Sequence, residues 1–208
     1  LNDLIRTTIR EHKRIIFNGN NYSDEWVKEA ERRGLYNLKS TAEALPYYIA
    51  DRNIQLFTKH NIFTPEEMHS RFEIQLDNYC KVLHIEALTM LEMARRDILP
   101  AVGSYIKELS ETAKDKKAFS AQLSCQVEEA LLEKLSNLSY CLYKKTEKLD
   151  EEILGAKNHT ELTDSANYYY ESVFGAMREL RAVADELETI TAEKHWPFPT
   201  YGDLLFRV

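Results

Sequence analysis

The sequence predicts an all-α protein: an up-and-down bundle of long antiparallel helices, with a small N-terminal strand-turn-helix block and an extended aromatic C-terminal tail. Three long stretches of the chain carry apolar residues at helical spacing, and short connections join them. The 208 residues include only 6 glycines and 5 prolines, so few positions interrupt a helix. Because 44% of the residues are hydrophobic, we expect a globular chain and not a disordered one.

The N-terminal block combines three short elements. Apolar residues at helical spacing predict a helix over residues 1–11. Residues 14–17 form a short β-prone run, which we interpret as a strand, and the turn dipeptide Asn18-Gly19 follows it. Ser23 suits the N-cap of the next helix, which we expect to end at Gly34.

The loop after this strand has two interpretations. A loop rich in glycine and asparagine could cradle a phosphate, but the sequence contains neither GxxxxGK[ST] nor GxGxxG. We therefore interpret it as a tight turn. The mixed pattern gives way to purely helical patterns between Gly34 and Lys39, which predicts a domain boundary that separates residues 1–38 from residues 39–208.

Capping signals mark the next two helices. Ser40 and Glu43 have the spacing of a capping box, before a helix that we expect to run to Phe57. The sequence Thr64-Pro65-Glu66-Glu67 combines a cap, a proline at the first helical position and a second capping box.

The helix that starts at Pro65 is predicted to be long. Its apolar stripe keeps helical period to about Ala113, so at Pro100 we expect a kink and not a stop. The charged segment from Thr112 to Lys117 breaks the stripe and is predicted to be a turn.

Two further helices and a tail complete the chain. The helix after Ser40 and the helix from Pro65 carry the first two apolar stripes. A third stripe runs from Phe119 to Ile153, and Thr160 is predicted to cap a fourth stripe that ends at Ile190. The last residues carry two prolines, which we take to exclude a helix there. We expect this tail to dock onto the bundle or the N-terminal block through its aromatic side chains, Trp196, Phe198, Tyr201 and Phe206.

Composition limits the partners. A net charge of −7 argues against a nucleic-acid partner, and no segment is apolar for long enough to cross a bilayer, so we expect no membrane partner. The three cysteines form no CxxC motif. Scattered, unpaired cysteines fit buried thiols and a reducing compartment, so we expect a cytoplasmic protein.

No constellation in the sequence predicts an active site. Glu66 and His69 form a single ExxH motif at the start of a helix, where di-metal bundles need two such motifs on facing helices. The six histidines are dispersed, and no spacing supports a catalytic triad. We therefore predict no catalytic, no cofactor-binding and no metal-binding residue. His84 lies mid-helix, as a satisfied core residue or a contact between helices.

The run Tyr168-Tyr169-Tyr170 is a second aromatic feature. The fourth stripe predicts that Tyr169 points inward, whereas Tyr168 and Tyr170 flank the stripe. These two side chains are candidates for a partner surface, and a position at the wet edge of the bundle explains them equally well.

Four long stretches resemble the C-terminal region of type III glutamine synthetases. They span residues 13–35 (KRIIFNGNNYSDEWVKEAERRGL), 40–61 (STAEALPYYIADRNIQLFTKHN), 85–102 (IEALTMLEMARRDILPAV) and 177–206 (MRELRAVADELETITAEKHWPFPTYGDLLF). The segment from Gly103 to Ala166 is typical of a helical bundle and less distinctive.

The resemblance implies a parent enzyme that joins ammonia to glutamate with ATP and with Mg²⁺ or Mn²⁺, as a large homo-oligomer. The catalytic motifs of that family would lie upstream, so no catalytic residue carries over to this chain. Residues 1–38 would end the catalytic-domain region, and residues 39–208 would form a non-catalytic helical domain for subunit assembly or regulation. The partners implied are the upstream catalytic domain and other subunits.

Two other hypotheses remain open. The bundle pattern and the acidic charge also fit a free-standing helical interaction or scaffold module without ligase activity. A small helical enzyme is the weakest hypothesis, because the inward positions are nearly all apolar and a bundle enzyme needs convergent polar groups there.

Overall fold

A computed structural model describes residues 1–206, except for the side chains of Tyr201 and Phe206. This part of the chain is all helical and contains no β-strand. The predicted all-α bundle is therefore confirmed. Its N-terminal helices are α1 (Asn2–Glu11), α2 (Asp24–Arg32), α3 (Thr41–Tyr48) and α4 (Asp51–Lys59), with a 3-10 turn η1 (Lys13–Ile15) after α1.

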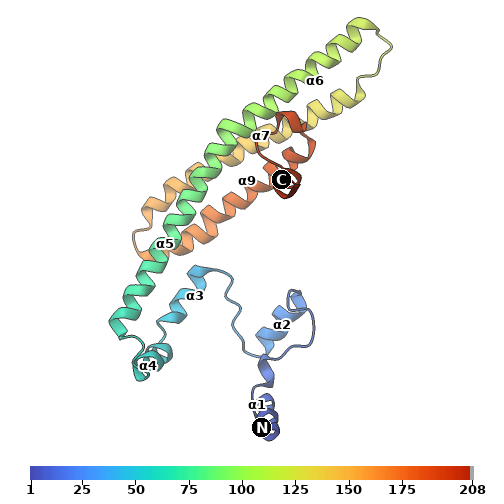
Figure 1. Cartoon of the computed structure of the whole chain (residues 1–208). Coiled ribbons are helices and arrows are strands. Elements are labelled where there is room, and N and C mark those ends of the chain that lie inside the picture. Colours follow the sequence, from blue (N-terminus) through green and yellow to red (C-terminus); the bar gives the residue numbers. More distant parts are fainter. Residues whose placement is uncertain (207–208) are drawn as a thin grey trace.

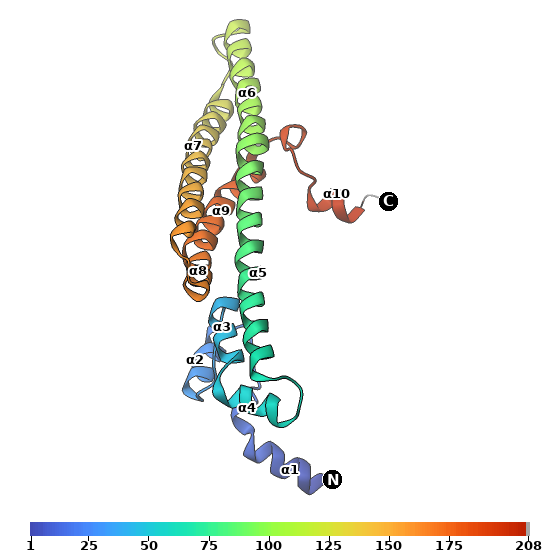
Figure 2. The ribbon, with the colours of Figure 1, turned by 90° about the vertical axis from the view of Figure 1, so that its left-hand side faces the viewer.

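Three long helical rods form the bundle (Figures 1 and 2). The first joins α5 (Pro65–Glu92), a π-helical turn η2 (Met93–Ile98) and α6 (Leu99–Phe119). The second is α7 (Gln126–Gly155), which the 3-10 turn η3 (Ala156–Asn158) follows. The third joins α8 (Leu162–Tyr168), a π-helical turn η4 (Tyr169–Val173) and α9 (Phe174–Ile190), and it packs mainly on α7.

The core of the bundle runs along the seam between the rods. Each rod supplies fully buried side chains at helical spacing, such as Leu76 and Val102 on the first, Leu135 and Leu142 on the second and Leu187 on the third. Burial of such aliphatic side chains contributes roughly 1.5–3 kcal/mol each. No helix in residues 1–206 is long and apolar enough to cross a membrane.

The expected strand at residues 14–17 is wrong. Arg14 and Ile15 lie in η1, which follows α1, and Ile16 and Phe17 belong to the irregular stretch between η1 and α2. Within the described residues no other strand is present to pair with this run. Instead, the Arg33 guanidinium donates hydrogen bonds to the carbonyl oxygens of Arg14 (3.1 Å) and Ile16 (2.6 Å), which satisfies groups that a sheet would have paired.

The predicted start and end of α2 have different outcomes. Gly34 has φ +69° and follows the C-cap residue, and the amide of Leu35 donates to the carbonyl of Ala30 at 2.9 Å. This is the Schellman arrangement, so the predicted glycine stop is confirmed. Ser23 occupies the N-cap position, but its hydroxyl donates to the carbonyl of Asn20 and makes no capping bond.

The helix expected from Ser40 to Phe57 is two helices. Ser40 accepts a hydrogen bond from the amide of Glu43, as predicted, but α3 ends at Tyr48 and α4 begins at Asp51. At the end of α3 the carbonyl of Tyr47 accepts hydrogen bonds from the Asn53 side chain at 2.6 Å and from the amide of Ala50 at 3.2 Å.

The long first rod begins as predicted and passes Pro100 without a break. The capping box of Thr64 and Glu67 is complete. Proline lacks an N–H and its ring crowds the carbonyl four residues earlier. The π-helical turn η2 lies just before Pro100, where the amide of Leu99 donates to the carbonyl of Ala94, and this wider turn accommodates the proline within a continuous rod (Figure 2).

Three predicted boundaries are wrong. The charged segment from Thr112 to Lys117 is helical, because α6 continues to Phe119. Thr160 is not the cap of the fourth stripe; Glu161 is, and its carboxylate accepts from the amide of Asp164 at 2.7 Å. The two prolines of the tail do not exclude a helix there, because α10 (Tyr201–Phe206) begins after both of them.

A polar contact joins the first and third rods. Tyr169 is buried, and its hydroxyl lies 3.1 Å from Nδ1 of His84, so His84 is a contact between α5 and η4. Cys80 and Cys125 are buried, Cys141 is half-buried, and all three are free thiols. Burial raises the pKa of the Cys80 thiol.

Candidate functional site

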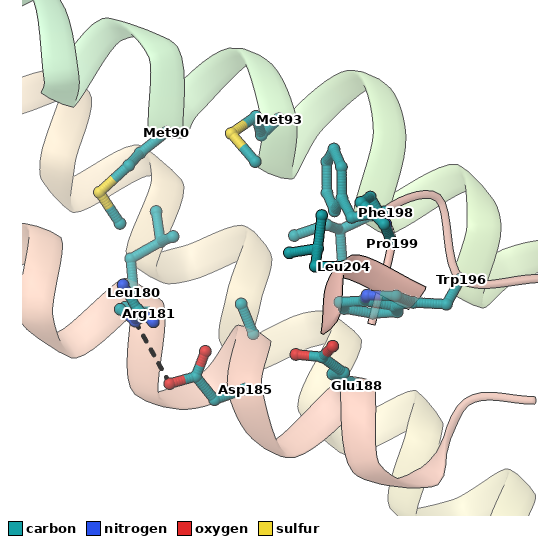
Figure 3. A pocket seen from close by; sticks show the side chains of 12 residues that line it. Met90, Met93, Leu180, Arg181, Asp185, Glu188, Trp196, Phe198, Pro199 and Leu204 are labelled. Atoms are coloured by element: carbon teal, nitrogen blue, oxygen red, sulfur yellow. Dashed lines mark hydrogen bonds and ion pairs between the residues drawn. The ribbon is translucent and has the colours of Figure 1, made fainter. Parts of the chain in front are cut away.

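A cleft in the described part of the chain lies between α5, η2, α9 and the C-terminal segment, and it has a volume of about 420 Å³ (Figure 3). Its walls are mostly apolar. The apolar lining residues are Met90, Met93, Ile98, Leu180, Ala184, Trp196, Phe198, Pro199 and Leu204, and the polar ones are Arg181, Asp185 and Glu188.

Helix geometry builds two walls of this cleft. Met90 at the end of α5 and Met93 in η2 extend from the first rod, and Leu180 and Ala184 lie one turn apart on α9. Methionine side chains are flexible and adapt to irregular spaces, so this wall can adjust to what it contacts.

The third wall is the C-terminal segment, which one glutamate ties to α6. Glu108 accepts hydrogen bonds from Nζ of Lys194 at 2.8 Å, and its second oxygen lies 2.9 Å from Nε2 of His195. The hydrogen bonds from Lys194 and His195 hold the pKa of Glu108 below its usual value. His195 also lies beside Tyr105, with ring centroids 5.5 Å apart.

Beyond this anchor, two aromatic side chains cover the bundle. Trp196 and Phe198 are half-buried against the core, and their rings meet edge to face with centroids 6.3 Å apart. The rim opposite carries an ion pair between Arg181 and Asp185 at 3.4 Å, and the Glu188 carboxylate faces the cleft near Trp196 (Figure 3).

The chemistry that this cleft supports is apolar contact. Its carboxylates lie at an exposed rim, and its walls carry no serine, cysteine or histidine that could act as a nucleophile or base. Within residues 1–206, no group of three or more acidic, histidine or cysteine side chains could hold a metal ion. The cleft is therefore suited to an apolar side chain or segment.

The six residues predicted as interface or docking positions do not lie together. Trp196 and Phe198 line the cleft, whereas the side chains of Tyr201 and Phe206 lie outside the described part of the chain. The expected extended tail is instead a 3-10 turn η5 (Glu193–His195), a short irregular stretch and α10.

Tyr168 and Tyr170 lie on the third rod, in α8 and η4, away from the lining of the cleft. The Tyr168 hydroxyl donates to the carboxylate of Glu152 at 2.6 Å, and this bond, together with burial, raises the Tyr168 pKa to about 12. Its ring stacks on His159, with centroids 4.2 Å apart. Tyr170 stacks on Phe174 and packs against the core.

Sequence reasoning missed the anchor and the methionine wall. Lys194 binds Glu108, which lies 86 residues away in the sequence. No local pattern shows that pairing. Met90 and Met93 were not among the predicted site residues, and the π-helical turn that carries Met93 has no sequence signature.

Comparison with known proteins identifies the family. A sequence model described as the glutamine synthetase C-terminal domain matches residues 1–117, which is more than half of the chain. This chain belongs to the glutamine synthetase family. The match includes both sides of the boundary predicted near residue 38, and that boundary stays a prediction.

Relatives of this glutamine synthetase region extend along the whole chain. A glutamine synthetase of Butyrivibrio fibrisolvens is 45% identical over 98% of the chain, and a type-3 glutamine synthetase of Dictyostelium discoideum is 34% identical over 99%. A glutamine synthetase of Bacteroides fragilis is 28% identical over 98%. The resemblance to a type III C-terminal region is thereby confirmed. The chain spans 29%, 28% and 28% of these relatives, which is less than a third of their length.

Proposed function

We propose that this chain is a non-catalytic helical region of a type III glutamine synthetase and serves subunit assembly or regulation. The observation that carries this proposal is the match to the C-terminal domain of the family, by a chain that spans less than a third of its relatives. The complete enzyme would join ammonia to glutamate with ATP and with Mg²⁺ or Mn²⁺, in the cytoplasm, as a homo-oligomer. Those activities would reside in an upstream catalytic domain.

The N-terminal helix supports this view of the partner. Leu4, Ile5 and Ile9 recur at helical spacing on α1, Leu1 is its N-cap residue, and all four side chains are exposed. No residue of α1 is buried in this chain, and Figure 1 shows α1 lying apart from the bundle. An amphipathic helix with a bare apolar face is stabilised by packing on another surface. The catalytic domain is the partner that we propose for it.

Two assays test this proposal. The isolated chain should form no glutamine from glutamate, ammonia and ATP with Mg²⁺. In a complete enzyme that carries this chain, the double substitution Leu4→Ser and Ile9→Ser should lower the melting temperature and the assembled fraction, because it removes apolar contacts at the proposed interface. Exposed Thr7 on α1 provides the matched control, and Thr7→Ser should change neither quantity.

Each assay has a contrary outcome. Glutamine formed by the isolated chain would contradict the non-catalytic role. If the α1 substitutions leave the melting temperature and the assembled fraction of the complete enzyme unchanged, α1 is not part of the interface. A partner other than the ligase, found on α1, would instead favour the free-standing scaffold.

A further inference from the structure

The hairpin between α6 and α7 projects beyond the rest of the bundle (Figures 1 and 2). Near the end of the third rod, Glu186 pairs with Lys134 of α7 at 2.9 Å, and after that rod Lys194 pairs with Glu108 of α6. From these two contacts to its tip, the hairpin consists only of the end of α6, the connecting turn and the start of α7. We call residues 109–133 the arm.

Internal contacts hold the end of the arm together. The Lys116 ammonium binds the Glu128 carboxylate at 2.5 Å, and the Cys125 thiol lies 3.6 Å from the carbonyl oxygen of Ala113. Cys125 and Glu128 are both buried. These contacts join α6 to the start of α7, so the arm presents a defined surface and not a loose loop.

The tip of the arm exposes three large apolar side chains. Phe119 ends α6 and is 87% exposed, Val127 in the first turn of α7 is 68% exposed, and Leu123 in the connecting turn is 41% exposed. Three large apolar side chains at the end of a projecting hairpin are a costly surface to leave in water. Exposed apolar patches of this kind mark interaction sites.

Charges of opposite sign border this tip. Exposed Lys114 and Lys117 lie on the last turns of α6, with Asp115 between them, and exposed Glu129 and Glu133 lie on the first turns of α7. Within residues 1–206, neither lysine and neither of these glutamates forms an ion pair. One side of the tip therefore has a net positive charge and the other a net negative charge.

We propose that the tip of the arm is an interface between two copies of this chain. A two-fold axis brings the same patch of both copies together. The lysine side of one copy would then face the glutamate side of its partner, and Phe119, Leu123 and Val127 would be buried between them. This self-complementary charge favours a second copy over an unrelated partner.

The inference rests on the proposed assembly role and specifies its contact. A patch of this size gives a weak contact between isolated chains. In a homo-oligomer, several such contacts form together and gain from their high effective concentration. We therefore expect the isolated chain to dimerise in a concentration-dependent manner.

Analytical ultracentrifugation of the 208-residue chain over a range of concentrations tests the proposal. Phe119→Ser should raise the dimer dissociation constant at least tenfold. Tyr140→Ser is the matched control, because Tyr140 is an exposed aromatic residue of α7 outside the arm and its loss should leave the constant unchanged. Circular dichroism melting curves identify any variant that has not folded.

Charge reversal provides a test that does not depend on apolar packing. Lys117→Glu and Glu129→Lys should each weaken the dimer at least threefold, and the double variant should restore it, because the opposite charges again face each other across the axis. A chain that stays monomeric at all concentrations, a dimer unaffected by Phe119→Ser, or a double variant that fails to recover would each overturn the proposal.

The same variants in a complete enzyme separate the two proposals. If the α1 substitutions disrupt assembly and the arm variants do not, the assembly role stands and the arm interface fails.

Discussion

At the scale of single residues, Gly155 occupies a position that only glycine fits. It lies at the end of α7 with helical backbone angles, φ −59° and ψ −33°, so its backbone would accept any residue. A Cβ atom there would overlap the Tyr168 hydroxyl and lie 3.3 Å from Cζ of the same ring. Glu152 and His159 hold that ring in place, so it cannot move away freely.

We therefore expect Gly155→Ala to destabilise the chain by about 1–2 kcal/mol, although alanine is the better helix former. Urea denaturation measures this change. Gly103→Ala in α6 is the matched control, since a Cβ there meets nothing within 4 Å and the substitution should stabilise by up to about 1 kcal/mol. Tyr168→Phe combined with Gly155→Ala should recover part of the loss. Equal effects of the two glycine substitutions would show that Tyr168 does not restrict position 155.

At the scale of elements, capping decides where helices begin, and not every capping signal in the sequence is used. Thr64 accepts from the amide of Glu67 at 3.2 Å, and the Glu67 carboxylate accepts from the amide of Thr64 at 2.8 Å. Thr160 has a similar position before an apolar stripe, but α8 starts one residue later, with Glu161 as its cap. A capping residue in the sequence therefore does not by itself decide where the helix begins.

Thr64→Ala should therefore lower the free energy of unfolding by about 1 kcal/mol, because the amide of Glu67 loses its acceptor. Thr64→Ser should lower the free energy of unfolding much less than Thr64→Ala does, because serine keeps the hydroxyl acceptor. Thr160→Ala should change the free energy of unfolding by less than about 0.5 kcal/mol. Equilibrium denaturation in urea measures all three. A loss at Thr160 as large as that at Thr64 would contradict the assignment of Glu161 as the cap.

Two further elements differ from the sequence-based prediction. The β-prone run at residues 14–17 had no second strand to pair with, and Arg33 satisfies two of its carbonyls instead. The start of α10 has a capping signal in the sequence, but the two prolines led us to exclude a helix there. Thr200 and Asp203 exchange hydrogen bonds between the amide of each and the side chain of the other, as in a capping box, and both prolines precede that start.

At the scale of the whole molecule, the C-terminal segment fastens the bundle from outside. It reaches α6 through Glu108, and Trp196 and Phe198 cover the seam between the first and third rods. These contacts join residues far apart in the sequence, so their loss should lower the stability of the bundle as a unit.

Truncation after Glu193 should lower the free energy of unfolding by about 2–4 kcal/mol and the melting temperature by roughly 4–16 °C, because it removes two half-buried aromatics and the cations on Glu108. Differential scanning calorimetry measures the shift. Truncation after Thr200 is the control: it removes α10, whose Leu204 lines the cleft but is 65% exposed and whose Leu205 is 71% exposed, and it should have a smaller effect. An unchanged melting temperature after the first truncation would mean that the segment does not stabilise this chain.

The sequence by itself determined the all-α class, the order of the rods, the cap at Thr64, the stop at Gly34 and the inward direction of Tyr169, because each depends on helical periodicity or on residues within one turn. It also identified Trp196 and Phe198 as candidates for docking. Only the tertiary structure decided the cleft, the Glu108 anchor and the projecting arm. Those features depend on which rod lies beside which, and on where the third rod ends. Because residues that meet across helices can be 86 positions apart, as Glu108 and Lys194 are, no local pattern specifies them.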